Sequence, residues 1–216
     1  MKKSVVAVIG GQILYDPVTG FRTSTLEDFD NPYGLFADSL RTDAASVLYF
    51  GSRPWARVLV IGGITPLHRT MPDAPTLSSV MRKELESTGV PSSKIEEIPM
   101  PEAGGTFNQL VRLRDWRESV VDEDEIIVLA SWWQMPRILA MVMFPEPLVA
   151  LVSGWPPVRF ACAEDVLIEN EPHRWWAAIA RAYRRPEMQE CLRKEYNGAR
   201  MLSTGEYKFP TRFPQR

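Results

Sequence analysis

The sequence predicts an α/β protein with a three-layer, Rossmann-like architecture: a mostly parallel, doubly wound sheet with a C-terminal helical extension. Two observations support this fold class. Short apolar runs rich in β-branched residues lack any polar–apolar alternation, which is typical of strands buried on both faces of a parallel sheet. Segments of about a dozen residues with helical periodicity separate those runs, as in successive βαβ units.

The predicted strands are short apolar runs, most of them followed by a turn signal. The four clearest runs are 5–9 (VVAVI), 57–61 (RVLVI), 125–130 (EIIVLA) and 148–152 (LVALV). A shorter strand is expected over 95–99, and an edge strand over 158–162. Glycine or serine stands at the exit of each of the four clear runs, as expected where a buried strand turns into a loop.

Helical spacing of apolar residues predicts the intervening helices. They are expected over 37–49, 76–88, 106–120 and 136–144, followed by a helix that opens at Glu171–Pro172 and a last one from 186 to about 196. In the helix after Pro172, the residues expected on one buried face are Trp176, Ile179, Ala180 and Tyr183. From Gly198 onward the chain is expected to be extended or mobile.

Residues 1–154 are therefore expected to form the Rossmann-like unit, and residues 155–216 to form helices and a tail packed on the same domain. A long connection over 14–38, rich in Asp, Thr and Pro, is expected to be a lid or a binding loop.

Composition indicates a globular protein and argues against several partners. Apolar residues make up 45 % of the 216 positions, and 25 basic residues nearly balance 27 acidic ones. This balance indicates neither a nucleic-acid partner nor a membrane surface. The first apolar run is too short for a signal peptide, and no stretch is long enough to span a membrane. Cys162 and Cys191 belong to no pairing motif and fit reduced thiols, so we expect a soluble, cytoplasmic protein.

The predicted strand ends locate a candidate ligand site. In open parallel sheets, ligands bind in the crevice outside the carboxyl ends of the strands. The residues expected at that edge are Gly10, Gly11, Gln12, Gly62, Gly63, Ser131 and Trp132. Glycine there lets a ligand approach main-chain N–H groups closely. The alternative is that the glycines only form turns.

Common catalytic and cofactor motifs are absent from the sequence. GxGxxG, GxxxxGK[ST], HExxH, CxxC and GxSxG do not occur. The two histidines, His68 and His173, lie far apart in sequence. His68 follows the second Gly–Gly pair, whereas His173 opens a surface helix. The sequence therefore predicts neither a metal site nor a dinucleotide cofactor, and it does not identify any other cofactor.

Six segments spread over about 4–152 form a recognisable series. They are AVIGG at 7–11, RTDAASVL at 41–48, RVLVIGG at 57–63, PTLSSVMRKELESTGVPSSKI at 75–95, AGGTFNQL at 103–110 and IIVLASWWQMPRILAM at 126–141. In this order and spacing they resemble the YdcF/SanA-like family, a bacterial family of undefined reaction. The resemblance implies a Rossmann-like fold and a link to bacterial cell-envelope metabolism.

The chain departs from that family at polar positions. Leu77 stands where the family has an acidic residue, and Asn108 replaces the carboxylate of its Thr-x-Glu-Asn motif, here 106–109. Gln134 replaces the histidine of its Thr-Ser-x-x-His-x-x-Arg segment, here 130–137, whereas Arg137 is retained and Arg41 matches a family arginine. The changes remove groups suited to proton transfer, because amides are not general bases near neutral pH.

The retained groups suit an anionic or nucleotide-like ligand. Arginines bind phosphate or carboxylate with two parallel hydrogen bonds, and helix starts near Thr106 and Pro136 would add partial positive charge. Each residue also has a structural interpretation. Arg41 and Arg137 could be surface charges, Thr106 could be only a helix cap, and the Trp132–Trp133 pair could be packed rather than stacked on a ligand.

Three functional hypotheses follow. The first is a small-molecule-binding domain of the YdcF-like type. The second is a transferase or hydrolase acting on a phosphorylated or nucleotide-linked substrate, with His68 or carboxylates from the loops 14–38 and 65–74. The third is a non-catalytic interaction module that uses Trp175 and Trp176 with their flanking arginines. The sequence does not decide whether the chain forms a homo-oligomer.

Overall fold

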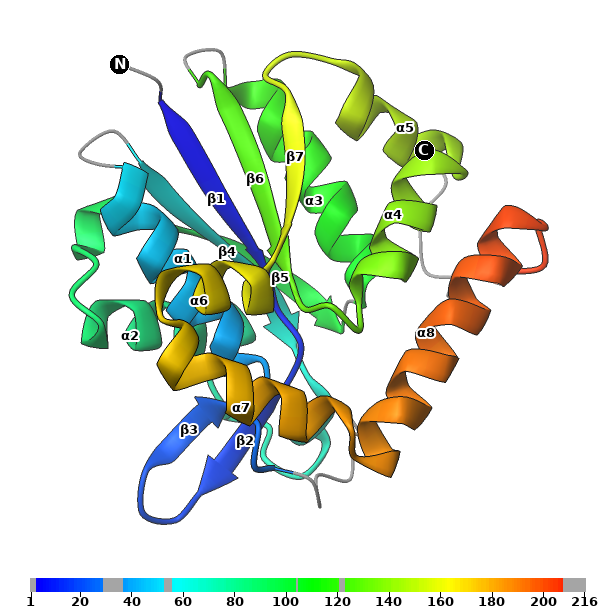
Figure 1. The fold of residues 1–216 in the computed structure, drawn as a ribbon. Helices are drawn as coiled ribbons and strands as arrows, with labels where there is room; N and C mark the ends of the chain where they lie inside the picture. Colours follow the sequence, from blue (N-terminus) through cyan, green and yellow to red (C-terminus); the bar gives the residue numbers. More distant parts are fainter. Residues whose placement is uncertain (1–2, 29–36, 53–55, 104, 121–122, 208–216) are drawn as a thin grey trace.

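In the computed structural model, residues 3–28, 37–52, 56–103, 105–120 and 123–207 are described (Figure 1). Within them, five strands form a parallel sheet in the order β5-β4-β1-β6-β7. The strands are β1 (Ser4–Ile9), β4 (Arg57–Ile64), β5 (Ile95–Ala103), β6 (Glu125–Ala130) and β7 (Val158–Cys162). The predicted fold class is confirmed.

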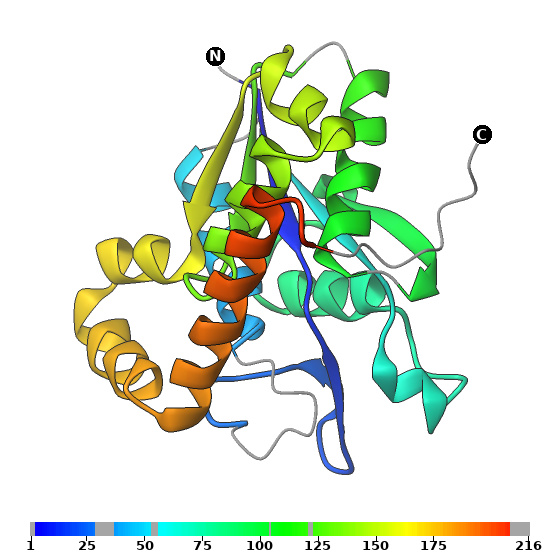
Figure 2. The same cartoon turned by 90° about the vertical axis from the view of Figure 1, so that its right-hand side faces the viewer.

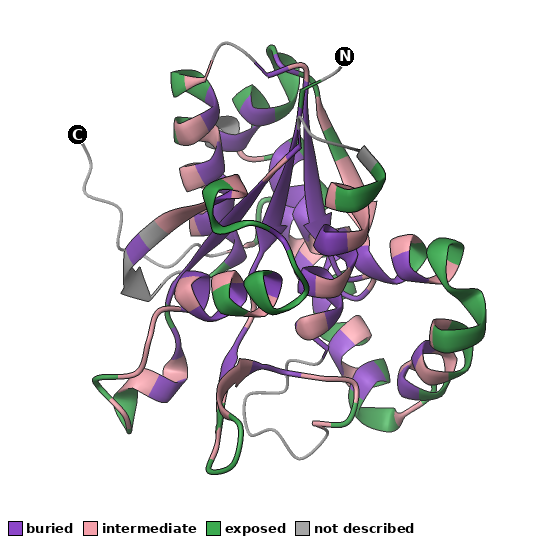
Figure 3. Cartoon of the chain, turned by 90° about the vertical axis from the view of Figure 1, so that its left-hand side faces the viewer, coloured by how far each residue is buried: buried purple, intermediate pink, exposed green. Residues whose placement is uncertain are grey.

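The central strand β1 is buried along its whole length. Val6 and Val8 point into the hydrophobic cluster on one face of the sheet, whereas Val5, Ala7 and Ile9 point into the cluster on the other. Because successive side chains of a strand face opposite sides, burial on both faces requires apolar residues at every position. Figure 3 shows this buried centre between the two helical layers.

Helices cover both faces of the sheet (Figures 1 and 2). The first layer contains α1 (Ser39–Ser52), α2 (Leu77–Ser87) and α6 (Ala163–Asn170), and the second contains α3 (Thr106–Ser119), α4 (Met135–Met143) and α5 (Glu146–Ser153). Helices α7 (Pro172–Tyr183) and α8 (Pro186–Ser203) follow. Helix α7 contacts α6, and α8 returns along α4.

The strand order places a switch point between β1 and β6. After β1 the chain adds β4 and then β5 on one side, and it later adds β6 and β7 on the other. The crevice outside the carboxyl ends of the strands at such a point is the usual ligand site of doubly wound sheets.

The prediction of a strand over 148–152 is wrong, because these residues form most of α5. Leu148 and Leu151 are buried, whereas Val149 and Val152 are each 38 % exposed. Burial at positions i and i+3 is typical of a helix, and Pro145 occupies the N-cap position of α5. The fifth strand of the sheet is instead β7, the predicted edge strand, which comes from beyond Gly154.

The C-terminal region is more helical than expected. Helix α6 was not predicted, and α8 continues through Gly198 to Ser203, so the expectation of an extended chain from Gly198 is wrong up to that residue; positions 208–216 lie outside the described residues. The predicted buried face of α7 is wrong at Trp176, which is 61 % exposed, because the helix buries Ile179 and Ala182.

The expected loop over 14–38 contains a hairpin of β2 (Ile13–Asp16) and β3 (Gly20–Thr23), and its positions 29–36 lie outside the described residues. None of the described helices has the length and apolarity needed to cross a membrane. Cys162 and Cys191 are not joined in a disulfide.

Candidate functional site

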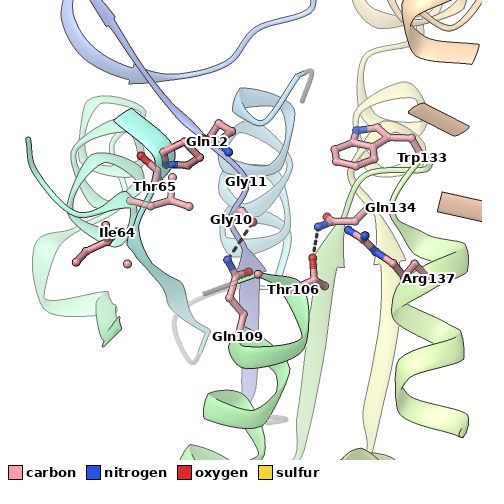
Figure 4. Close-up of a pocket in the computed structure, with 14 residues that line it drawn as sticks. Gly10, Gly11, Gln12, Ile64, Thr65, Thr106, Gln109, Trp133, Gln134 and Arg137 are labelled. Carbon is pink, nitrogen blue, oxygen red and sulfur yellow. Dashed lines mark hydrogen bonds between the residues drawn. The ribbon is translucent and has the colours of Figure 1, made fainter. Parts of the chain in front are cut away.

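A pocket of about 280 Å³ lies at the carboxyl ends of β1, β4 and β6 and so includes the switch point of the sheet (Figure 4). The described residues that line it are Gly10, Gly11, Gln12, Gly63, Ile64, Thr65, Pro66, Leu77, Gly105, Thr106, Gln109, Trp133, Gln134 and Arg137. Both glycine turns, Thr106 and Arg137 therefore lie around one cavity.

Close packing explains the glycines of this edge. A Cβ atom on Gly10 would lie 2.5 Å from Leu77 Cδ2, and one on Gly62 would lie 2.8 Å from Leu77 Cγ. Leu77 thus fills the space between the ends of β1 and β4. Gly62 does not line the pocket, and Leu77 forms an apolar part of its wall.

Two helices begin at the pocket without a capping side chain. The N-cap of α3 is Gly105, and the N-cap of α4 is Gln134. The interpretation of Thr106 as a helix cap is wrong, since Thr106 is the first residue of α3 and its hydroxyl accepts a hydrogen bond from Gln134 Nε2 at 2.9 Å. The helix dipole places partial positive charge at both starts, which makes this edge of the pocket electropositive.

Arg137 reaches the pocket from the first turn of α4. Its Nε forms an ion pair with Glu195 Oε2 at 2.8 Å, and its side chain is 25 % exposed. The aliphatic part of the Arg137 side chain packs closely against α8 at Gly198. A Cβ atom added to Gly198 would lie 3.2 Å from Arg137 Cδ. The two terminal guanidinium nitrogens make no hydrogen bond or ion pair with any described residue, and Figure 4 shows the guanidinium directed toward Gln134 and Thr106.

Glu195 holds one edge of that guanidinium. Burial raises the pKa of the Glu195 carboxyl to about 7, although the nearby charges of Arg137 and Arg41 oppose the shift. Only 6 % of Glu195 is exposed. The carboxyl was not singled out in the sequence, because it stands in an amphipathic helix where a glutamate is usually solvated.

Three glutamines around the pocket are buried, and the side-chain oxygen of each has no hydrogen-bond partner among the described residues. They are Gln12, Gln109 and Gln134, which are 7 %, 3 % and 3 % exposed. Gln109 Nε2 donates to the carbonyl of Gly10 at 3.2 Å.

Gln109 is a site residue that the sequence analysis missed. Asn108, which was predicted to line the site, is half-buried and does not line the pocket. The signal was present in the sequence, because Gln109 is three residues after Thr106 and so shares its helix face, whereas Asn108 does not.

Arg41 does not contact the pocket, so its predicted role as a ligand-binding charge is not supported. It is 0 % exposed. Its guanidinium forms an ion pair with Asp38 at 2.6 Å, donates to the carbonyl of Ile9 at 2.6 Å and donates from Nε to Ser131 Oγ at 3.0 Å. Arg41 therefore ties the exits of β1 and β6 together behind the pocket.

Asp38 completes this buried pair. It accepts hydrogen bonds from the main-chain N–H of Gln12 at 2.7 Å and from Ser24 Oγ at 3.1 Å. Burial raises the pKa of Asp38, and the charge of Arg41 opposes that shift. A Cβ on Gly11 would overlap the carboxylate of Asp38, so this glycine is required by close approach.

The exit of β6 uses a different tryptophan from the one predicted. Trp133 lines the pocket, and Arg41 lies 5.6 Å from the centre of its ring. Trp132 instead packs against Tyr183, at 5.3 Å between ring centres, and the main-chain N–H of Trp132 donates to Glu164 Oε2. Ser131 is fully buried, and its hydroxyl accepts a hydrogen bond from Arg41 Nε. Neither Ser131 nor Trp132 lines the pocket.

His68 has a local structural role. Its Nδ1 accepts a hydrogen bond from the N–H of Thr65 at 3.1 Å, at the start of the short 3-10 helix Pro66–Arg69. His68 does not line the pocket. Among the described residues, no group of three or more His, Cys, Asp or Glu side chains could hold a metal ion.

Comparison with known proteins finds no matching family model, no matching curated protein and no matching solved structure.

Proposed function

We propose that this chain is a small-molecule-binding protein of the YdcF-like type whose switch-point pocket holds a compact anionic ligand. The observation that carries the proposal is the arrangement of Arg137. Glu195 anchors one edge of its guanidinium, and the terminal nitrogens remain available for a phosphate or carboxylate.

The surroundings of Arg137 support an anion. Helix α3 has 14 residues and begins at the pocket, where Gly105 provides no capping side chain, so the dipole of the helix favours negative charge there. The lining residues among those described carry no carboxylate that would repel an anion.

The size of the pocket limits the ligand. Sites for drug-sized molecules occupy roughly 300–1,000 Å³, and this pocket of about 280 Å³ lies at the lower end of that range. A sugar phosphate or the phosphate-bearing part of a nucleotide fits this scale better than a whole dinucleotide.

We propose binding rather than turnover because of the pocket's chemistry. The described lining residues include no carboxylate, imidazole, thiol or amine. General acid–base catalysis needs such a group within hydrogen-bond reach of the ligand. A cytoplasmic, bacterial setting belongs to the same proposal, which the resemblance and the absence of a disulfide between Cys162 and Cys191 support.

Calorimetric titration with D-ribose 5-phosphate, AMP and inorganic phosphate tests this proposal. At least one of these probes should bind the native chain and raise its melting temperature. The double variant Arg137→Met/Glu195→Gln removes the guanidinium without leaving Glu195 charged and unpaired. We expect it to lose about tenfold or more in affinity, since a charge-assisted hydrogen bond contributes about 1.5–3 kcal/mol.

Glu195→Gln alone is the matched control, because it keeps Arg137 in place. The amide oxygen of Gln can still accept from Arg137 Nε, so we expect this variant to bind the probe more tightly than the double variant does. Failure of all three probes to bind, or equal binding by the double variant, would remove the anion site.

A further inference from the structure

The pocket contains hydrogen-bond acceptors that no described residue of the chain pairs with a donor. Gln12, Gln109 and Gln134 each have a buried side-chain oxygen without a hydrogen-bond partner among the described residues. Leaving a buried acceptor unpaired destabilises the folded state. All three residues line the same cavity, so one bound molecule with several donors could satisfy all of them.

A hydrogen bond to a carbonyl fixes the orientation of the Gln109 amide. Gln109 Nε2 donates to the carbonyl of Gly10, which can only accept, so the oxygen of Gln109 is the group left for a ligand. Gln134 Nε2 donates to Thr106 Oγ1. The pocket therefore offers acceptors at positions well separated in the chain, after β1, in α3 and before α4.

Resting on the proposed function, we infer that the ligand is a sugar phosphate, whose hydroxyl groups donate to the amide oxygens of Gln12, Gln109 and Gln134 while Arg137 binds its phosphate. A ligand ammonium group would also donate hydrogen bonds. Its burial, however, would require a counter-charge, and the described lining residues provide no carboxylate. Neutral hydroxyl donors match neutral amide acceptors.

The apolar part of the lining agrees with such a ligand. Trp133, Leu77 and Ile64 line the pocket beside the amides. A sugar ring has C–H faces between its hydroxyl groups, so it needs both apolar surface and acceptors. An alkyl phosphate of the same length needs only the apolar surface and the guanidinium.

A matched pair of probes isolates the hydroxyl groups. D-Ribose 5-phosphate and n-pentyl phosphate share a phosphate ester and a five-carbon chain but differ in hydroxyls. We expect calorimetric titration to show that the sugar phosphate binds at least about tenfold more tightly, because a site with buried polar groups discriminates against a ligand that leaves them unpaired.

Gln12→Met is the decisive variant, because the side chain of Gln12 makes no hydrogen bond with any described residue. The substitution therefore breaks no hydrogen bond within the described part of the chain. We expect its melting temperature to be at least that of the native chain. Its preference for ribose 5-phosphate over pentyl phosphate should fall severalfold, because the sugar phosphate loses a hydrogen bond and pentyl phosphate no longer leaves the Gln12 oxygen unpaired. Gln109→Met should act in the same direction.

Asn108→Met is the matched control, since Asn108 precedes Gln109 in α3 but lies outside the pocket. It should keep the native preference. Equal affinity for the two probes would overturn the sugar-phosphate inference and leave the anion site intact. An unchanged preference in both glutamine variants would do the same. Binding of neither probe would remove the anion site, and the inference with it.

Discussion

Arg41 and Arg137 are two arginines with the same chemistry and different environments. Arg41 is enclosed and bonded to Asp38, Ile9 and Ser131, whereas Arg137 is one-quarter exposed and bonded on one edge by Glu195. Sequence alone assigned both to the ligand. The difference arises from the folded positions of Asp38 and Glu195, which no local pattern places beside them.

Arg41→Met should therefore affect folding more than binding. The variant leaves Asp38 buried without its cation and frees the carbonyl of Ile9, which should lower the free energy of unfolding by about 3–5 kcal/mol. Urea denaturation measures this loss. Arg193→Met is the control, because Arg193 is 70 % exposed in its ion pair with Glu190, and it should change stability by less than about 1 kcal/mol. A mild effect of Arg41→Met would contradict the structural role given to this residue.

Two of the predicted site residues that do not line the pocket are replaced there by the next residue in the chain. Gln109 lines the pocket in place of Asn108, and Trp133 in place of Trp132. Helix periodicity would have corrected the first, because Thr106 and Gln109 share a face. The second could not be derived, since the turn between β6 and α4 follows neither the strand nor the helix period.

At the scale of elements, the sequence patterns that repeat over several residues were the most informative. The predicted helices near 76–88 and 106–120 lie within one or two residues of α2 and α3. The run 148–152 misled because β-branched composition outweighed the helical spacing of Leu148 and Leu151. Short apolar runs carry too few positions for periodicity to separate a strand from a buried helix.

Helix α8 links stability to pH through Glu195. Its pKa is about 7 in the folded protein and 4.5 in the reference state, so between these values the folded chain holds a proton that the unfolded chain has released. The free energy of unfolding should therefore fall as pH rises from about 4.5 to about 7, by up to about 1.4 kcal/mol per pH unit, and this contribution should level off above pH 7.

Glu195→Gln removes this titration. Denaturation at several pH values should show a shallower fall in stability for the variant than for the native chain over the same interval. An identical pH dependence would mean that Glu195 is not protonated in the folded state near pH 6.

At the scale of the whole molecule, the location of the site was more predictable than its contents. Strand ends of a doubly wound sheet meet at one edge, so the Gly10–Gly11 and Gly62–Gly63 turns indicated the correct region. The return of α8 beside α4 was not predictable, because it depends on tertiary packing of an amphipathic helix. That helix supplies Glu195, which orients Arg137.

The most direct test of the account is the structure of a crystal soaked with D-ribose 5-phosphate. We expect phosphate density within hydrogen-bond distance of the Arg137 guanidinium, and sugar hydroxyls within hydrogen-bond distance of Gln12 and Gln109. Density for the probe elsewhere on the molecule, or a pocket that holds only ordered water at saturating probe, would contradict it.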